Sequence, residues 1–349
     1  MAVNMNNDVK PEPAMSAADM PVKKRVFSGI QPTGNLHLGN YLGALRNWAQ
    51  TQAQYDNIFC IVDLHAITLP IDPKELHHST RQLAAVYLAA GLDLRYCKLF
   101  VQSHVREHAE ASWIMECFTP LGWLHRMTQF KSKAGDNIES VPTGLLCYPA
   151  LMACDILLHQ TNYVPVGDDQ RQHIEFTRDL AQRFNSLYDQ QIFTIPQDQI
   201  REVGARIMAL DDPTKKMSKS DPNPNSRINL LDDAKTIKQK IARATTDSER
   251  RVAFDENRPG IYNLVTIYQL LTGQTPQQIE DEFAGKGYGD FKAALTDQLV
   301  ATLEPIQARA RELMNDLPTL ENILKQGADA VRPTAAATLQ RIKDVVGLG

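Results

Sequence analysis

Short apolar runs alternate with amphipathic helical patterns through the first half of the chain. The apolar runs fall at residues 24–30, 57–64, 97–103 and 162–167, and helical patterns begin near Leu38, near Pro73 and after Gln170. This alternation is typical of a parallel sheet that helices cover on both faces. We therefore predict an α/β fold, with a Rossmann-like parallel sheet as a nucleotide-binding domain and a second, helical domain.

The β signal fades after about Phe193, and the patterns that follow are helical at residues 232–244, 262–273, 275–285 and 288–316. We predict a disordered leader at residues 1–22, a Rossmann-like catalytic domain at 23–205, a lysine-rich loop and junction at 206–228, and a helical domain at 229–349. The pattern leaves open whether the C-terminal helices pack back on the first domain.

Composition narrows the class of protein. The 349 residues are 43% hydrophobic and carry a net charge of −4, which argues against nucleic-acid binding through bulk positive charge but leaves local basic patches possible. Without a run of about 18 apolar residues, no membrane span is expected. The five cysteines stand singly, without a C-x-x-C pair, so we expect buried reduced thiols in a cytoplasmic protein and no metal cluster.

A glycine-rich turn follows the first predicted strand. In FSGIQPTGNLHLGN, three glycines (Gly29, Gly34 and Gly39) let the backbone approach a ligand, and a helix that begins near His37 offers N–H groups to phosphate. The spacing is not G-x-G-x-x-G, so a dinucleotide fingerprint is not supported. The turn predicts a nucleotide site at the carboxyl end of a strand, with a turn that serves packing alone as the alternative.

A polar run, KKMSKSDPNPNSR, occupies residues 215–227. Such a run is usually a solvated loop. If it faces the glycine-rich turn, Lys216 and Lys219 would instead neutralise phosphate charge and the loop could close over a nucleotide.

Two of these stretches resemble the signatures of class I aminoacyl-tRNA synthetases, since HLGN at 37–40 is similar to the first and KMSKS at 216–220 matches the second. Further segments, such as CIVDLHAIT, MTQFK, YPALMACDILL and VPVGDDQRQHIEFTRDLAQRFN, resemble the bacterial tryptophanyl-tRNA synthetase family. The resemblance covers almost everything after the leader. Asn40 replaces the second histidine of the class signature, which is usual in the tryptophan branch, so no histidine role carries over to that position.

The resemblance implies activation of tryptophan by ATP, followed by transfer to tRNA(Trp). This chemistry requires positioning of two reactants and neutralisation of charge on the leaving pyrophosphate, with Mg²⁺ between phosphate oxygens. The expected catalytic residues are Gln31, His37, Lys216 and Lys219. The other expected ATP contacts are Gly39, Asn40, Gly167, Asp169, Met217, Ser218 and Lys133, of which Lys133 could equally be a solvated lysine.

Asp155 lies among apolar residues in YPALMACDILLHQ, where an unpaired carboxylate is costly. In a pocket it would accept the indole N–H of tryptophan, which is also the role that the resemblance implies; the alternative is a carboxylate that faces solvent or pairs with an arginine. The expected apolar walls are Phe27, Met152, Val164 and Val166. Tyr148 and Gln170 are candidates for the α-amino group, and His65 is either a substrate contact or a structural histidine.

A basic helical pattern, with Lys235, Lys238, Lys240 and Arg243 at i,i+3 intervals, is either a solvated face or a patch for tRNA phosphates. The resemblance further implies a homodimer and a helical domain that binds the anticodon. Two other functions stay open from sequence: the tyrosine-specific relative, and a synthetase-like binding protein without catalysis.

Overall fold

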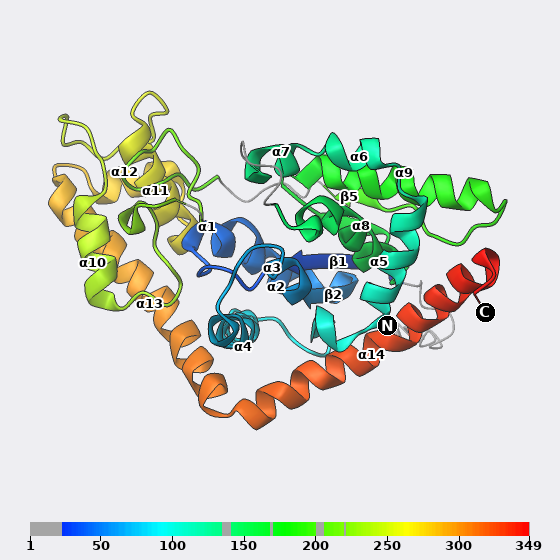
Figure 1. The fold of residues 1–349 in the computed structure, drawn as a ribbon. Helices are drawn as coiled ribbons and strands as arrows, with labels where there is room; N and C mark the ends of the chain where they lie inside the picture. Colours follow the sequence, from blue (N-terminus) through cyan, green and yellow to red (C-terminus); the bar gives the residue numbers. More distant parts are fainter. Residues whose placement is uncertain (1–22, 135–140, 168–169, 200–205, 220, 349) are drawn as a thin grey trace, which may run out of the picture.

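The computed structural model describes residues 23–134, 141–167, 170–199, 206–219 and 221–348 (Figure 1). Five parallel strands form its sheet in the order β3-β2-β1-β4-β5. Their bounds are β1 (Arg25–Ile30), β2 (Asp56–Ile61), β3 (Cys97–Val101), β4 (Tyr163–Pro165) and β5 (Gln197–Gln199). The α/β fold class is confirmed. The strand β5 was not predicted, because its three polar residues give no apolar run.

The central strand β1 sets the position of the crevice. It pairs with β2 from Arg25 opposite Asp56 to Ile30 opposite Ile61, and with β4 at Val26 opposite Tyr163. The chain passes first to one side of β1 and later to the other. The carboxyl ends of β1 and β4 therefore flank a topological switch point, where open parallel sheets bind ligands.

Helices cover the sheet between strands. The helix predicted near Leu38 runs as α1 (Leu38–Asn40), a π-helical turn (Tyr41–Leu45) and α2 (Arg46–Thr51). Asp72 caps the next predicted helix by accepting from the backbone N–H groups of Lys74 and Glu75. The helices of this part after α2 are α3 (Asp63–Ala66), α4 (Pro73–Ala89), α5 (Glu107–Phe118), α6 (Leu121–His125), α7 (Thr128–Ala134), α8 (Thr143–Leu157) and α9 (Arg171–Leu187).

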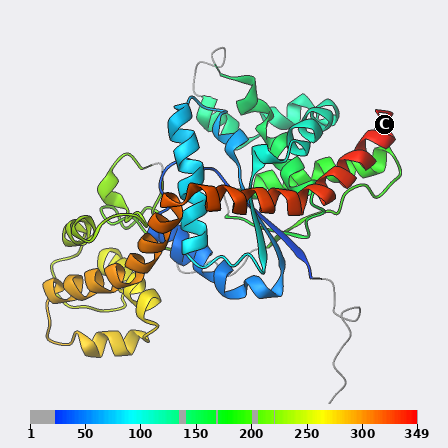
Figure 2. The same ribbon diagram turned by 90° about the horizontal axis from the view of Figure 1, so that it is seen from below.

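The C-terminal part is helical, as predicted. It consists of α10 (Ala234–Arg243), α11 (Pro259–Thr272), α12 (Pro276–Glu282), α13 (Tyr288–Asn315) and α14 (Leu317–Val346). Figure 1 shows α10 to α12 and the start of α13 in one lobe, from which α13 leads back to α4 and α14 runs along β3 and α5. Figure 2 views the molecule from below and shows α14 passing across the part that contains the sheet. One apolar cluster joins Leu38 and Leu42 to Ile237, Leu264 and Leu299, so the core is continuous across the predicted domain boundary at 229.

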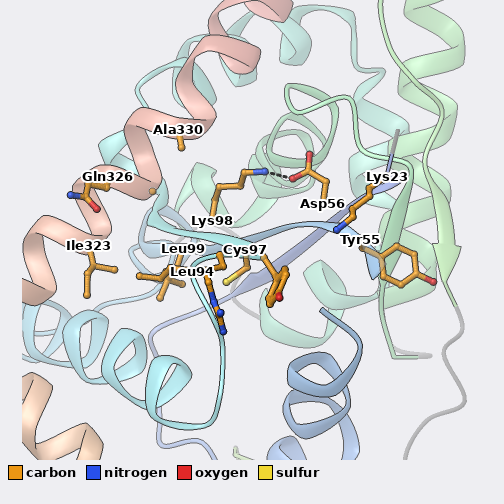
Figure 3. Close-up of a pocket in the computed structure, with 13 residues that line it drawn as sticks. Lys23, Tyr55, Asp56, Leu94, Cys97, Lys98, Leu99, Ile323, Gln326 and Ala330 are labelled. Atoms are coloured by element: carbon orange, nitrogen blue, oxygen red, sulfur yellow. Dashed lines mark hydrogen bonds and ion pairs between the residues drawn. The ribbon is translucent and has the colours of Figure 1, made fainter. Parts of the chain in front are cut away.

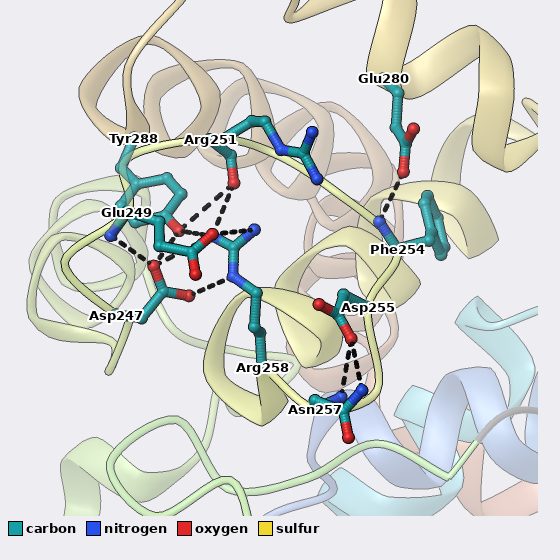
Figure 4. A network of polar contacts seen from close by, with 9 residues as sticks. All are labelled: Asp247, Glu249, Arg251, Phe254, Asp255, Asn257, Arg258, Glu280 and Tyr288. Atoms are coloured by element: carbon teal, nitrogen blue, oxygen red, sulfur yellow. Dashed lines mark hydrogen bonds and ion pairs between the residues drawn. The ribbon is translucent and has the colours of Figure 1, made fainter.

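A polar network joins the segment that connects α10 and α11 to the start of α13 (Figure 4). The buried Arg258 donates from Nε and Nη2 to Asp247, at 2.9 Å each, and from Nη2 to the Arg251 carbonyl. The Tyr288 hydroxyl donates to Asp247 at 2.6 Å. The hydrogen bonds from Arg258 hold the pKa of Asp247 well below its usual range.

A glycine allows α14 to touch the sheet. A Cβ added to Gly327 would lie 1.9 Å from the carbonyl oxygen of Leu99 in β3. We expect Gly327→Ala to lower the free energy of unfolding by about 3 kcal/mol, because helix and strand must separate. The measurement is chemical denaturation, with Gly289→Ala in α13 as the control, since a Cβ there meets nothing within 4 Å. Equal stability of Gly327→Ala and the wild type would contradict this close contact.

The cysteines are all free. Cys60, Cys97 and Cys154 are buried and Cys147 is half-buried, but Cys117 in α5 is exposed, so the expectation of buried thiols is wrong at that position. In the described part of the chain, no helix has the length and apolar character needed to cross a membrane.

Candidate active site

Polar side chains collect where the parallel strands end. Gln31 directly follows β1, His65 lies in α3 just after β2, Gln102 directly follows β3, and Gly167 comes two residues after β4. Because the carboxyl ends of parallel strands share one edge, these residues line the same side of the sheet. The helix that begins after His37 adds its amino end to this edge.

Backbone pairing anchors both ends of the lysine-rich run, and the pairing after its carboxyl end joins it to the residues that follow the glycine-rich turn. Isolated antiparallel bridges join Met208 to Lys216 and His37 to Asn229. The N–H of Leu38 donates to the Ile228 carbonyl at 2.8 Å, so this N–H of the helix start is not free for phosphate as the sequence predicted. The interpretation as a simple solvated loop does not describe a run anchored in this way.

Lys219 faces the turn across Gly34. The Cβ and Cδ atoms of Lys219 both lie 3.9 Å from the point where a Cβ on Gly34 would stand. Gly34 has φ +64°, a left-handed conformation that favours glycine. The turn and the lysine run are about 180 residues apart in sequence but form one local surface. Within the run, Lys219 is half-buried and Lys216 is exposed.

Three cations lie close to His37 on this surface. Burial lowers the pKa of Lys219 to about 8. Burial, with Lys219, Arg227 and Lys216 nearby, lowers the pKa of His37 to about 3, so His37 is neutral at physiological pH and can only offer a hydrogen bond. Arg227 was missed from sequence, although it is the last residue of the polar run. Three cations around a glycine turn suit a polyphosphate.

The other predicted ATP contacts differ in what they can offer. Met217 is 2% exposed, so its side chain belongs to the core and a contact with ATP would be made by its backbone. The Asn40 Oδ1 accepts from the His37 backbone N–H at 3.1 Å, and a Cβ on Gly39 would lie 3.1 Å from the His37 Nδ1. Gln31 and Ser218 are half-buried and Gly167 is exposed. Asp169, the Lys133 side chain and the leader at 1–22 lie outside the described residues.

Asp155 is buried, with 1% of its surface exposed, at the carboxyl end of α8. Its carboxylate accepts three hydrogen bonds, from His65 Nε2 at 2.8 Å, Gln102 Nε2 at 2.6 Å and His108 Nδ1 at 2.6 Å. The alternative of a solvent-facing or arginine-paired carboxylate is therefore wrong. Burial of Asp155 does not by itself require a substrate as partner, because the protein supplies partners of its own and His65 is one of them.

By its lone pairs, the carboxylate can accept one more hydrogen bond. Burial alone would raise the pKa of Asp155, but the hydrogen bonds from His108 and His65 outweigh it and lower the pKa to about 2. An ionised carboxylate has about four lone-pair positions, and three are occupied. Sequence reasoning missed Gln102 and His108; the position of Gln102 after a predicted strand was a usable signal, and His108 gave none.

Apolar groups surround this carboxylate. Phe27, Val164 and Tyr148 are buried in one cluster, against which the half-buried Met152 and Val166 pack. Burial raises the pKa of Tyr148 to about 12, so its hydroxyl keeps its proton and can donate to His173 Nε2, 2.7 Å away. His173 was not predicted. Gln170 precedes α9, and its backbone N–H donates to the Gly167 carbonyl at 3.0 Å.

A cavity of about 500 Å³ lies at the opposite edge of the sheet (Figure 3). Its wall includes Asp56 at the start of β2, Lys98 in β3 and residues of α14. Lys98 pairs with Asp56, and Lys23 donates to the Ala53 carbonyl at 2.6 Å. Its third cation, Arg95, pairs with Asp93, so all three cations that line this cavity are engaged by groups of the protein.

Comparison with known proteins gives one consistent result. The family model described as tRNA synthetases class I (W and Y) matches residues 22–304. A tryptophan-tRNA ligase of Wolinella succinogenes is 54% identical over 327 residues, which are 94% of this chain and 99% of the relative. A tryptophanyl-tRNA synthetase structure from Mycoplasma pneumoniae has a TM-score of 0.83 at 40% identity, covering 94% of this chain and 99% of that one. The Campylobacter jejuni enzyme, solved with ADP and tryptophan, has a TM-score of 0.83 at 34% identity, covering 93% and 100%.

Proposed function

The chain belongs to the class I tRNA synthetases for tryptophan and tyrosine, and from this premise we propose how its residues carry out the reaction. Its activity is that of a tryptophan-tRNA ligase, which uses ATP to form tryptophanyl-adenylate and pyrophosphate and then charges the 3′ end of tRNA(Trp). The observation that carries the assignment of roles is the arrangement of two unlike surfaces at one sheet edge: the cations at the glycine turn and the ionised carboxylate of Asp155 among apolar walls.

The cations would act on the triphosphate. As the tryptophan carboxylate attacks the α-phosphorus, the bond to pyrophosphate breaks and negative charge grows on the leaving group. Lys219 and Lys216 would stabilise that charge, while the neutral His37 and Gln31 donate hydrogen bonds to phosphate oxygens. Further ATP contacts are assigned to Gly39, Asn40, Gly167, Asp169, Lys133, Ser218 and the backbone of Met217.

Magnesium would arrive with the nucleotide. Among the described residues, no group of three or more histidine, cysteine or acidic side chains is placed to hold a metal ion. Mg²⁺ usually binds through one or two protein ligands together with substrate phosphates. We therefore assign Mg²⁺ to the phosphates of ATP, where it would neutralise charge alongside the lysines.

Tryptophan would lie with its indole between Phe27, Met152, Val164 and Val166, and its N–H on the open lone pair of Asp155. Tyr148 and Gln170 would hold the α-amino group. His65 is assigned to the pocket through Asp155, which it orients at 2.8 Å.

The tRNA would meet the basic helix α10 of the predicted helical domain. Lys235, Lys238 and Arg243 are exposed there. Lys240 is removed from the predicted patch, because it is 5% exposed and pairs with Asp232 at 2.5 Å. The role of residues 229–349 in anticodon binding rests on family membership. The five free cysteines suit a reducing compartment, and we assign the enzyme to the cytoplasm.

A second copy of the chain would cover an apolar surface on α3, α5 and α6. Trp113, Leu121 and Ile67 are exposed there, at 70%, 60% and 59%. A cavity of about 320 Å³ is lined by Ile67 together with Ser112 and Glu116 of α5 and Tyr148 and Leu151 of α8, among others. Exposed aromatic and aliphatic side chains on this scale mark association surfaces, so we assign a homodimer.

Trp113→Glu should therefore raise the dimer dissociation constant at least about a hundredfold, because a charge would be buried without a partner. Sedimentation velocity over a range of concentrations measures this. Leu187→Glu is the matched control, since Leu187 is 57% exposed at the end of α9. A wild-type chain that sediments as a monomer, or a dimer unaffected by Trp113→Glu, would remove this surface as the interface.

Charging of tRNA with labelled amino acid tests the whole reaction. Tryptophan should be attached to tRNA in the presence of ATP and Mg²⁺, and tyrosine should not. Charging with tyrosine, or none with either amino acid, would contradict the function.

A further inference from the structure

The hydrogen bonds around Asp155 continue into the core. His108, whose Nδ1 contacts Asp155, has its Nε2 3.2 Å from the Nε2 of His159. Both histidines are 0% exposed, and the Phe100 ring lies 5.9 Å from each of them. Asp155, His108 and His159 thus form a buried hydrogen-bonded relay.

The protons of this relay can be assigned from its geometry. Asp155 is ionised, so His108 Nδ1 donates to it. Of the two Nε2 atoms that face each other, one must donate and the other accept. We assign the donor to His159, which leaves His159 Nδ1 as an acceptor. His159 Nδ1 is buried without a hydrogen-bond partner. Burial of an unpaired neutral acceptor costs less free energy than burial of a charged imidazole. Burial and the neighbouring His108 also lower the pKa of His159 well below its usual value, which keeps it neutral.

The inner end of the relay contacts the apolar wall. The His159 ring is stacked on Phe27, with centroids 5.9 Å apart and planes 14° from parallel. Phe27 is the wall assigned to the indole ring. One histidine pair therefore links the acceptor for the indole N–H to a surface for the indole face.

We propose that His108 and His159 are positioning residues for tryptophan selection: they fix the Asp155 carboxylate so that its open lone pair, and the Phe27 ring, meet the indole together. The proposal rests on the pocket assigned to Asp155 under the proposed function. It extends that function, because discrimination would depend on residues that never touch the substrate.

Packing alone does not require this arrangement. A buried polar chain is usually no more stable than well-packed apolar residues of equal volume. Gln102 adds a second donor to the same oxygen, Oδ1, from the end of β3. Two donors converge on Oδ1, while Oδ2 accepts from His65 alone, so the open position lies on Oδ2.

The test compares tryptophan with 3-(benzothiophen-3-yl)alanine, in which sulfur replaces the indole N–H. The readout is the ratio of kcat/KM for the two amino acids in ATP–pyrophosphate exchange. General loosening of the pocket lowers both values, whereas a misplaced acceptor lowers only the value for tryptophan. His108→Leu removes the donor, and His108→Asn restores one near the position of Nδ1.

His108→Leu should lower the ratio about 10-fold to 100-fold, as loss of an orienting partner does elsewhere, and His108→Asn should recover most of it. Gln102→Met should shift the ratio in the same direction, and it serves if His108→Leu fails to fold. If Asp155→Asn lowers the ratio but folded His108→Leu or Gln102→Met leaves it unchanged, the positioning role of the relay is contradicted and the pocket at Asp155 is not. An unchanged ratio in Asp155→Asn would overturn both the relay and the pocket on which it rests.

Discussion

Replacing Lys219 with alanine should slow tryptophan activation about a hundredfold, with little change in the affinity for tryptophan. Loss of one preorganised donor to a developing negative charge typically costs about 10² to 10³ in rate. Lys219 is half-buried against the glycine turn, so its charge acts through less water than the exposed Lys216. Single-turnover formation of tryptophanyl-adenylate measures the rate directly.

Lys215 provides the matched control. It belongs to the same run but is exposed and pairs with Asp212 at 2.9 Å. Lys215→Ala should leave the activation rate within a few-fold of wild type. Equal losses in Lys215→Ala and Lys219→Ala would mean that the run acts through bulk charge, and weaker ATP binding without loss of rate would contradict a role in the transition state.

The pKa of Lys219 adds a pH dependence. With a pKa of about 8 in the free enzyme, Lys219 is charged below that pH and neutral above it. The value of kcat/KM for ATP reports the free enzyme and should therefore fall as pH rises through about 8. Lys219→Arg keeps a cation at all these pH values and should lack this fall. The same fall in Lys219→Arg would assign it to another group.

Asp155→Asn should reduce kcat/KM for tryptophan about a thousandfold, with the KM for ATP nearly unchanged. The substitution removes the charge and sets an amide donor against His65 or His108, and breaking a buried charged hydrogen-bond network costs about 2–5 kcal/mol. The comparison is pyrophosphate exchange with tryptophan varied at saturating ATP. Unchanged tryptophan kinetics would remove Asp155 from the pocket.

A variant of a second aspartate, Asp56, serves as a control that distinguishes a loss of tryptophan selection from a loss of stability. Asp56 is also engaged by two groups, Arg25 and Lys98, but it lies at the opposite edge of the sheet. Asp56→Asn should lower stability without changing tryptophan selection. Similar kinetic losses in the two variants would indicate a general effect of disturbing the sheet.

Local pattern was enough to predict four strands and the helices α10 to α13, because buried parallel strands are apolar runs and amphipathic helices have a clear period. It could not predict β5, made of three polar residues, or the packing of α14 on β3, which depends on the absence of a side chain at Gly327. Both depend on tertiary neighbours.

The chemical character of the candidate site was predictable from sequence, but the partners of its side chains were not. Resemblance directed attention to the lysine run and the glycine turn, and the structure places Lys219 over Gly34. The donors to Asp155 come from 90, 53 and 47 residues away in sequence, so no local signal shows that His65, Gln102 and His108 contact Asp155. Lys240 was misread for the same reason, since its partner Asp232 lies eight residues earlier, outside the helix.

The most direct test of the central claim is ATP–pyrophosphate exchange on the purified chain with tryptophan, with tyrosine and with no amino acid. This assay isolates activation and needs no tRNA. The site described here predicts exchange that depends on tryptophan alone, because only an indole offers both the N–H for Asp155 and a ring that fills the apolar walls. Exchange supported by tyrosine, or no exchange from folded protein that binds ATP, would contradict it.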